Sequence, residues 1–91
     1  MEKDNIYSTR DLYLAACLVT LKFRLLRTDF QIEGSGSRMV GYFVFEDGAA
    51  LRDTVDKYQQ GLLLIEPRLY VTNQKSLKAQ VINWINNPNK V

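Results

Sequence analysis

Apolar residues form a continuous run from Leu12 to Val19 near the start of the chain. A helix that is apolar nearly all round is buried on more than one side. The run therefore predicts a central helix, from about Thr9 to Leu21, that is covered by a sheet on one flank and by other helices on another. Residues 1–6 are expected to precede it as a polar tail.

The residues from Tyr7 to Leu12 predict how this helix begins. Ser8 is placed to cap the first free backbone N–H groups. Asp11 can reach back to the Ser8 N–H, as in a capping box with Asp in place of the usual Glu. Tyr7 and Leu12 occupy the positions of a hydrophobic staple.

Two further stretches, Phe23–Glu33 and Arg38–Glu46, predict the strands of a hairpin, and Gly34–Ser37 supplies its turn. The four-residue turn sets the register, because a slip by one residue would mix the two faces of the sheet. Gly41 is expected to leave room for the Phe30 ring. One face of the hairpin is then almost entirely apolar and carries the pairs Ile32–Met39, Phe30–Gly41, Thr28–Phe43 and Leu26–Phe45.

The opposite face of the hairpin carries a second apolar row, formed by Val40, Tyr42 and Val44. Either another helix of the same chain covers this row or a partner does. In the second case the back of the sheet, or its open edge, is a natural protein interface.

A second helix is predicted from an N-cap at Asp47 to the residue before Gly61, a good C-terminal residue. Its apolar stripe has helical spacing and consists of Leu51, Val55 and Tyr58. The apolar run Leu62–Ile65 that follows is either a third strand or an extended connector, and periodicity alone does not decide between them.

A third helix is predicted from Pro67, which suits the first turn of a helix, to about Asn86, before Pro88. Thr72, Asn73 and Ser76 weaken it, so a break there is the alternative. The chain is thus predicted as one α+β domain, residues 7–87, in the order α-β-β-α-(β)-α, followed by a tail, residues 88–91. The apolar stripe of this helix comprises Tyr70, Leu77, Val81, Trp84 and Ile85.

Composition narrows the chemistry that is open to this chain of 91 residues. Cys17 is its single cysteine and there is no histidine, which removes the commonest general base and the commonest metal ligand. Cys17 lies in the apolar run and is expected to be a buried small hydrophobe. We therefore expect no cofactor. The polar start and the short apolar run favour a soluble cytoplasmic protein over a membrane protein.

The phrase Tyr7-Ser8-Thr9-Arg10-Asp11-Leu12-Tyr13-Leu14-Ala15-Ala16 resembles the opening of a family of small bacterial and phage-associated proteins of unknown function. Phe45-Glu46-Asp47 after the hairpin, a helix closing on Gly61 and Leu77-Lys78 in a helix begun by Pro67 extend the resemblance over most of residues 7–80. It implies a compact α+β unit and brings no activity or site residues.

No hydrolase, kinase, dinucleotide-binding or zinc signature is present in the sequence. The segment Gly34–Ser37 lacks the Lys-Ser/Thr ending and the strand-to-helix context of a phosphate-binding loop. The neighbouring carboxylates at Glu46-Asp47, and at Asp53 and Asp56, are interpreted as a cap and as solvated charges. We therefore expect that the protein is not an enzyme.

Arg10 is the one residue of the opening phrase without a structural duty. It could bind an anion or a carboxylate near the positive end of the helix, or pair with Asp11, Asp4 or Glu2.

Basic residues gather in the last quarter of the chain. Residues 67–91 contain four basic residues and no acidic one. Arg68, Lys75 and Lys78 fall on one side of the predicted third helix, where a basic face could track phosphates, helped by Arg10. The net charge of only +2 makes that field weak.

The leading hypothesis for function is a non-catalytic protein-interaction module that self-associates or joins a larger assembly. The second apolar row, Val40, Tyr42 and Val44, is its candidate interface. The alternative is a nucleic-acid-binding accessory protein that uses Arg10, Arg68, Lys75 and Lys78.

Overall fold

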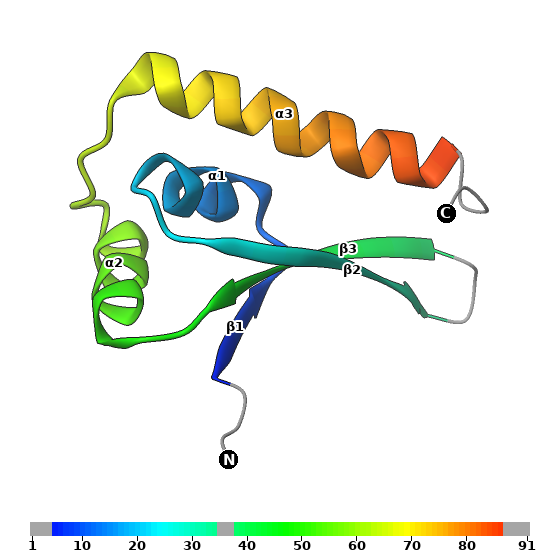
Figure 1. Cartoon of the computed structure of the whole chain (residues 1–91), viewed down its shortest axis with the longest axis horizontal. Coiled ribbons are helices and arrows are strands. Elements are labelled where there is room, and N and C mark those ends of the chain that lie inside the picture. The colour runs from blue at the N-terminus through cyan, green and yellow to red at the C-terminus, as the bar shows by residue number, and fades with distance from the viewer. Residues whose placement is uncertain (1–4, 35–37, 87–91) are drawn as a thin grey trace.

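The computed structural model describes residues 5–34 and 38–86. Within them the elements follow the order β-α-β-β-α-α, so the expected α+β class is confirmed while the expected order gains a strand at its start (Figure 1). The predicted turn positions 35–37 and the predicted tail, residues 88–91, lie outside the described residues. The elements are β1 (Ile6–Thr9), α1 (Leu12–Thr20), β2 (Leu25–Glu33), β3 (Arg38–Glu46), α2 (Ala49–Gln60) and α3 (Pro67–Asn86).

The predicted start of the first helix is wrong. Residues Ile6–Thr9 form β1, which pairs antiparallel with the end of β3, so that Ser8 lies opposite Val44 and caps nothing. The cap is Asp11, whose Oδ1 accepts hydrogen bonds from the N–H groups of Tyr13 and Leu14 at 2.9 and 3.2 Å. Pairing with a neighbouring strand satisfies more backbone groups than one extra helical turn, and Asp11 caps the shorter helix equally well.

The register of the hairpin is confirmed from Glu33–Arg38 to Thr28–Phe43. Beyond that point a bulge between Leu25 and Arg27 brings Leu25, not Leu26, opposite Phe45. The strand also begins at Leu25, two residues later than expected. The bulge keeps an apolar side chain against the core and leaves Leu26 39% exposed.

The three strands form one sheet in the order β1-β3-β2, with α1 and α3 above one face and α2 at one end (Figure 1). The N-terminal half of α3 lies over α1, and its C-terminal half lies over the β2–β3 hairpin. As expected, α1 is the central helix, and Cys17 within it is buried. The core cluster combines α1 with β3, α2 and α3, and its buried members are Leu14, Ala15, Ala16, Leu18, Phe43, Phe45, Leu51, Val55 and Leu77.

The second helix begins after Gly48, so the predicted N-cap at Asp47 is wrong by one residue. The Asp47 carboxylate instead accepts a hydrogen bond from the Gly48 N–H and binds Arg52. The predicted end is confirmed, because Gly61 follows the helix in the left-handed conformation that favours glycine. The run Leu62–Ile65 has no regular secondary structure, so it is an extended connector and not a third strand of the hairpin sheet.

The third helix is continuous through the segment where a break was considered. Asn73 donates a hydrogen bond from Nδ2 to the Thr20 hydroxyl at 3.0 Å, and that hydroxyl donates to the Ala16 carbonyl at 2.7 Å. This polar link between α3 and the buried end of α1 offsets the low helix propensity of Asn73. The predicted apolar stripe is buried or half-buried except for Ile85, which is 47% exposed.

Candidate functional site

Arg10 takes part in a structural ion pair whose partner the sequence did not indicate. Its Nη1 lies 3.2 Å from Glu33 Oε1, at the far end of the hairpin, and the Tyr42 hydroxyl donates to the other oxygen of the same carboxylate. The hydrogen bond to Glu33 raises the pKa of Tyr42. The three side chains tie the segment between β1 and α1 to the hairpin.

Asp11 links α1 to α2 with the carboxylate oxygen that the helix cap leaves unused. The Tyr58 hydroxyl donates to Asp11 Oδ2 at 3.0 Å. Burial, aided by this hydrogen bond, raises the pKa of Tyr58 to about 12. Both oxygens of the Asp11 carboxylate therefore accept hydrogen bonds from groups of the domain, and the side chain is not presented to a substrate.

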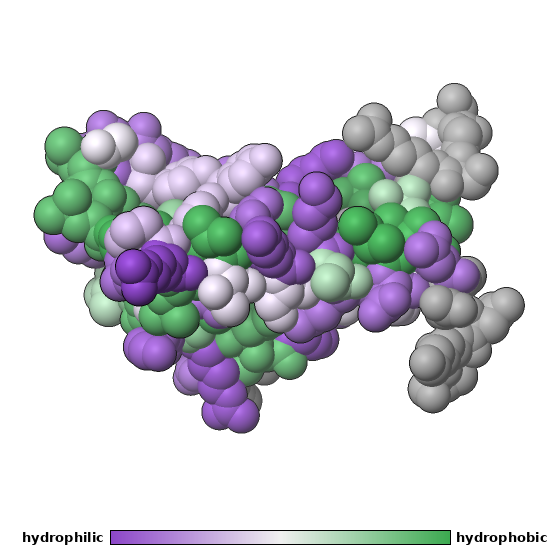
Figure 2. Space-filling view, turned by 90° about the horizontal axis from the view of Figure 1, so that it is seen from above, coloured by the Kyte–Doolittle hydropathy of each residue, from purple (hydrophilic) through white to green (hydrophobic). Residues whose placement is uncertain are grey.

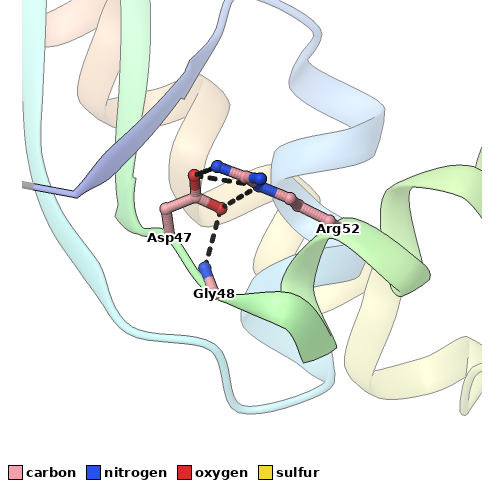
Figure 3. A network of polar contacts seen from close by, with 3 residues as sticks. All are labelled: Asp47, Gly48 and Arg52. Carbon is pink, nitrogen blue, oxygen red and sulfur yellow. Dashed lines mark hydrogen bonds and ion pairs between the residues drawn. The ribbon is translucent and has the colours of Figure 1, made fainter.

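A third polar cluster, formed by Asp47, Gly48 and Arg52, stands where the chain passes from β3 to α2 (Figure 3). Arg52 Nη2 lies 2.6 Å from Asp47 Oδ2, and Arg52 Nε lies 3.1 Å from each carboxylate oxygen. The Gly48 N–H donates to Asp47 Oδ1 at 2.7 Å. These bonds hold the pKa of Asp47 below its usual value, so the carboxylate stays ionised and paired.

The described residues contain no group of three Cys, Asp or Glu side chains that could hold a metal ion. Burial raises the pKa of the Cys17 thiol, which keeps it protonated and a poor nucleophile. Among the helices of residues 5–34 and 38–86, none combines the length and apolar character that a membrane crossing requires.

The second apolar row of the hairpin is covered within the chain at two of its three positions. Val44 is fully buried and Val40 is 8% exposed, while Tyr42 is half-buried with its hydroxyl on Glu33. The sequence left open whether the chain itself or a partner covers this row. At Val40 and Val44 the chain itself does so. These two side chains offer almost no surface for an interface.

A groove of about 330 Å³ lies between β3 and α3 and combines residues that are distant in the sequence. Arg10 and Leu12 line its end, at the point where the chain leaves β1 for α1. The strand wall and the helix wall are mainly apolar, and they are lined by Met39, Val40, Gly41 and Phe43 on β3 and by Lys78, Val81 and Ile82 on α3.

Of the predicted basic residues, the structure brings Arg10 and Lys78 together at this groove. Arg68 and Lys75 are exposed on α3 but do not line it. Both basic residues of the groove and most of its apolar residues were named from the sequence, but their meeting at one groove was not predicted. No local pattern in the sequence indicated it, because the groove depends on β1 ending at Thr9 and pairing with only part of β3.

Apolar side chains are exposed around the C-terminal half of α3 and the hairpin (Figure 2, right). Ile32 is 65% exposed, and Ile82 and Ile85 are each 47% exposed. A second exposed apolar region lies at the opposite end, in the connector between α2 and α3, where Leu62 is 63% and Leu64 is 88% exposed. Where exposed apolar groups form a contiguous patch, they are typical of a site where another molecule binds.

Comparisons with protein-family models, with curated proteins and with solved structures give no match for this chain. The family resemblance of residues 7–80 therefore stays a prediction.

Proposed function

We propose that the chain is a non-catalytic protein-interaction module that self-associates or joins a larger assembly. The observation that carries this proposal is the exposure of three large apolar side chains, Ile32 on β2 and Ile82 and Ile85 on α3. The polar clusters support it indirectly, because Asp11, Glu33 and Asp47 each bind another side chain of the domain and hold the fold together.

The size of the domain favours the same conclusion. A chain of 91 residues buries only about 60–65% of its unfolded surface, so each large apolar side chain left in water is a substantial loss of stability. Covering Ile32, Ile82 and Ile85 on association would recover about 25 cal/mol for every Å² of apolar surface removed from water. Association therefore adds stability that the monomer lacks.

The experiment is light scattering coupled to size exclusion over a wide range of protein concentration. We expect a mass above the 10.5 kDa of the monomer, and we expect Ile32→Glu to return the protein to the monomer. Leu64→Glu is the matched control, because it places the same charge in the other exposed apolar region. A wild-type protein that stays monomeric at high concentration and captures no partner in a pull-down would count against the proposal.

The second candidate is a nucleic-acid-binding accessory protein. It is favoured by the exposed Arg68, Lys75 and Lys78 on α3, a helix without any acidic residue, and by the approach of Arg10 to Lys78. Binding to phosphates would weaken as salt rises. The test is an electrophoretic shift assay at low salt with the three α3 residues changed to Glu. The absence of any shift with the wild-type protein would remove this candidate.

A further inference from the structure

The side of β3 that faces the groove is an open strand edge along about half of its length. On the other side of the strand, β2 pairs with β3 as far as Arg38. On the groove side, β1 pairs only with residues 43–46 before the chain turns into α1. In the described part of the chain, residues 38–42 therefore have no strand partner on this side. Alternate residues along such an edge present N–H and C=O groups to whatever lies beside them.

The groove offers room and apolar contact for a chain placed along this edge. Leu12 closes one end, and Val81 and Ile82 on α3 form the wall opposite the strand. Ile82 is 47% exposed, so an apolar side chain laid against it would remove surface from water. A strand edge with a side-chain wall is the arrangement that accepts an added strand, in which backbone bonds supply affinity and the wall supplies specificity.

The charges beside the edge select the occupant. Among the side chains that the structure describes, the charged ones that line the groove are Arg10 and Lys78, and both are basic. Lys78 has no ion-pair partner among the described residues. Arg10 donates from one nitrogen to Glu33, and its half-exposed guanidinium carries further N–H donors. A second copy paired through the same edge would bring two more cations to this position, which like-charge repulsion disfavours.

We propose that the edge of β3 at residues 38–42 binds an extended, acidic segment of a partner protein, which adds a fourth strand to the sheet. The backbone of the segment pairs with β3, its carboxylates meet Arg10 and Lys78, and its apolar side chains pack on Val81 and Ile82. This inference rests on the proposed function as an interaction module and names the partner chemistry for one surface of it.

The test uses the whole chain, labelled with ¹⁵N, and a synthetic peptide of about eight residues. Every second residue of the peptide is threonine, and the positions between them are valine and glutamate in turn, so that one face of the strand carries both. We expect the peptide to shift the amide signals of residues 38–42 and to slow hydrogen exchange at alternate positions among them. A peptide in which lysine replaces glutamate should bind at least about tenfold more weakly, because it meets Arg10 and Lys78 with like charge. No binding of the acidic peptide, or shifts confined to other parts of the molecule, would overturn the proposal.

Two variants on α3 separate the groove from the general charge of the protein. Lys78→Glu should weaken binding of the acidic peptide by at least about tenfold, because it reverses a charge that lines the groove. Lys75→Glu changes the net charge equally on the same helix but does not line the groove, so it should leave binding within about twofold. An equal loss in both variants would overturn the proposal, since it would show that only net charge matters. The amide spectra of both variants report whether the fold is intact.

Two further outcomes would show that the edge of β3 binds something other than an acidic peptide segment, and each would overturn the proposal. Amide signals of residues 38–42 that move with protein concentration alone would assign the edge to a second copy of the chain. A single-stranded oligonucleotide that binds at the same amides more tightly than the acidic peptide would assign the groove to nucleic acid. The light-scattering experiment with Ile32→Glu tests the interaction module independently of the β3 edge. A failure of the edge proposal therefore leaves the proposed interaction module intact.

Discussion

Tyr58 and Asp11 are 47 residues apart in the sequence, and the Tyr58 hydroxyl donates a hydrogen bond to Asp11 Oδ2 at 3.0 Å. The other oxygen of the same carboxylate caps α1. One side chain thus starts the central helix and fastens α2 to it. The stability of the domain should therefore respond more strongly to changes at Asp11 than to changes at Ser8, the cap that the sequence pattern favours.

Replacement of Asp11 with alanine tests this assignment. Asp11→Ala is expected to lower the free energy of unfolding by about 2 kcal/mol, of which about 1 kcal/mol comes from the lost cap and about 1 kcal/mol from the lost bond to Tyr58. Ser8→Ala should change it by less than about 0.5 kcal/mol, since Ser8 is exposed in β1 and caps no helix. Urea unfolding measures both values. A larger loss for Ser8→Ala than for Asp11→Ala would contradict the assignment.

The raised pKa of Tyr58 predicts how stability depends on alkaline pH. In the folded protein the hydroxyl holds its proton up to about pH 12, whereas in the unfolded chain it releases it near pH 10. The folded state therefore binds more protons in this window, and the free energy of unfolding falls as pH rises through it. The contribution is fully present below about pH 10. Tyr58→Phe should flatten this decline, which urea unfolding at a series of pH values would measure.

Gly41 should tolerate no side chain while Phe30 keeps its position. A Cβ at Gly41 would lie 3.1 Å from Phe30 Cε1, and the Phe30 ring is stacked on Trp84 with centroids 4.1 Å apart. Gly41→Ala is expected to lower the free energy of unfolding by about 1–3 kcal/mol. In a Phe30→Leu background the same change should cost less, because the clashing ring is gone. Equal costs in both backgrounds, measured by thermal or urea unfolding, would refute this explanation.

The lowered pKa of Asp47 predicts the behaviour at acid pH. A carboxylate whose folded pKa is depressed stabilises the protein above its unfolded pKa, near 4, and this contribution is lost as pH falls through the folded value. Arg52→Gln should raise the midpoint of the Asp47 titration followed by carboxyl NMR. Lys57→Gln is the control, because Lys57 pairs with Asp53 at 3.3 Å and not with Asp47. An unchanged midpoint in Arg52→Gln would show that Arg52 is not the cause.

Much of the fold follows from short-range patterns in the sequence. The pairing of Phe30 with Gly41, the end of α2 at Gly61 and the start of α3 at Pro67 were all predictable. Each depends on residues close in the chain or on a register that one turn sets. The N-cap of α2 was predicted one residue too early, at Asp47. A carboxylate next to a helix start can serve equally as the cap or as the partner of a basic side chain, here Arg52.

The candidate site was predictable only in part. Arg10 and Lys78 were singled out by their charge, but their common groove depends on β1 ending at Thr9, opposite Phe43. Ile82 lies on α3 at the groove, and nothing local in the sequence indicated that this part of the helix would border a strand edge. The apolar row at Val40 and Val44 pointed to an interface, yet the chain itself covers both side chains.

Local patterns were enough to predict the hairpin register from Glu33–Arg38 to Thr28–Phe43, the apolar central helix and the apolar stripe of α2, because side-chain periodicity and turn chemistry act over a few residues. Contacts between distant segments place residues 6–9 beside β3 as a strand, pair Arg10 with Glu33 and leave the edge of β3 open beside α3. For the start of the chain, a helical turn capped by Ser8 and a strand ending before Asp11 are both locally reasonable. The backbone hydrogen bonds to β3, which exist only when distant segments meet, decide between them.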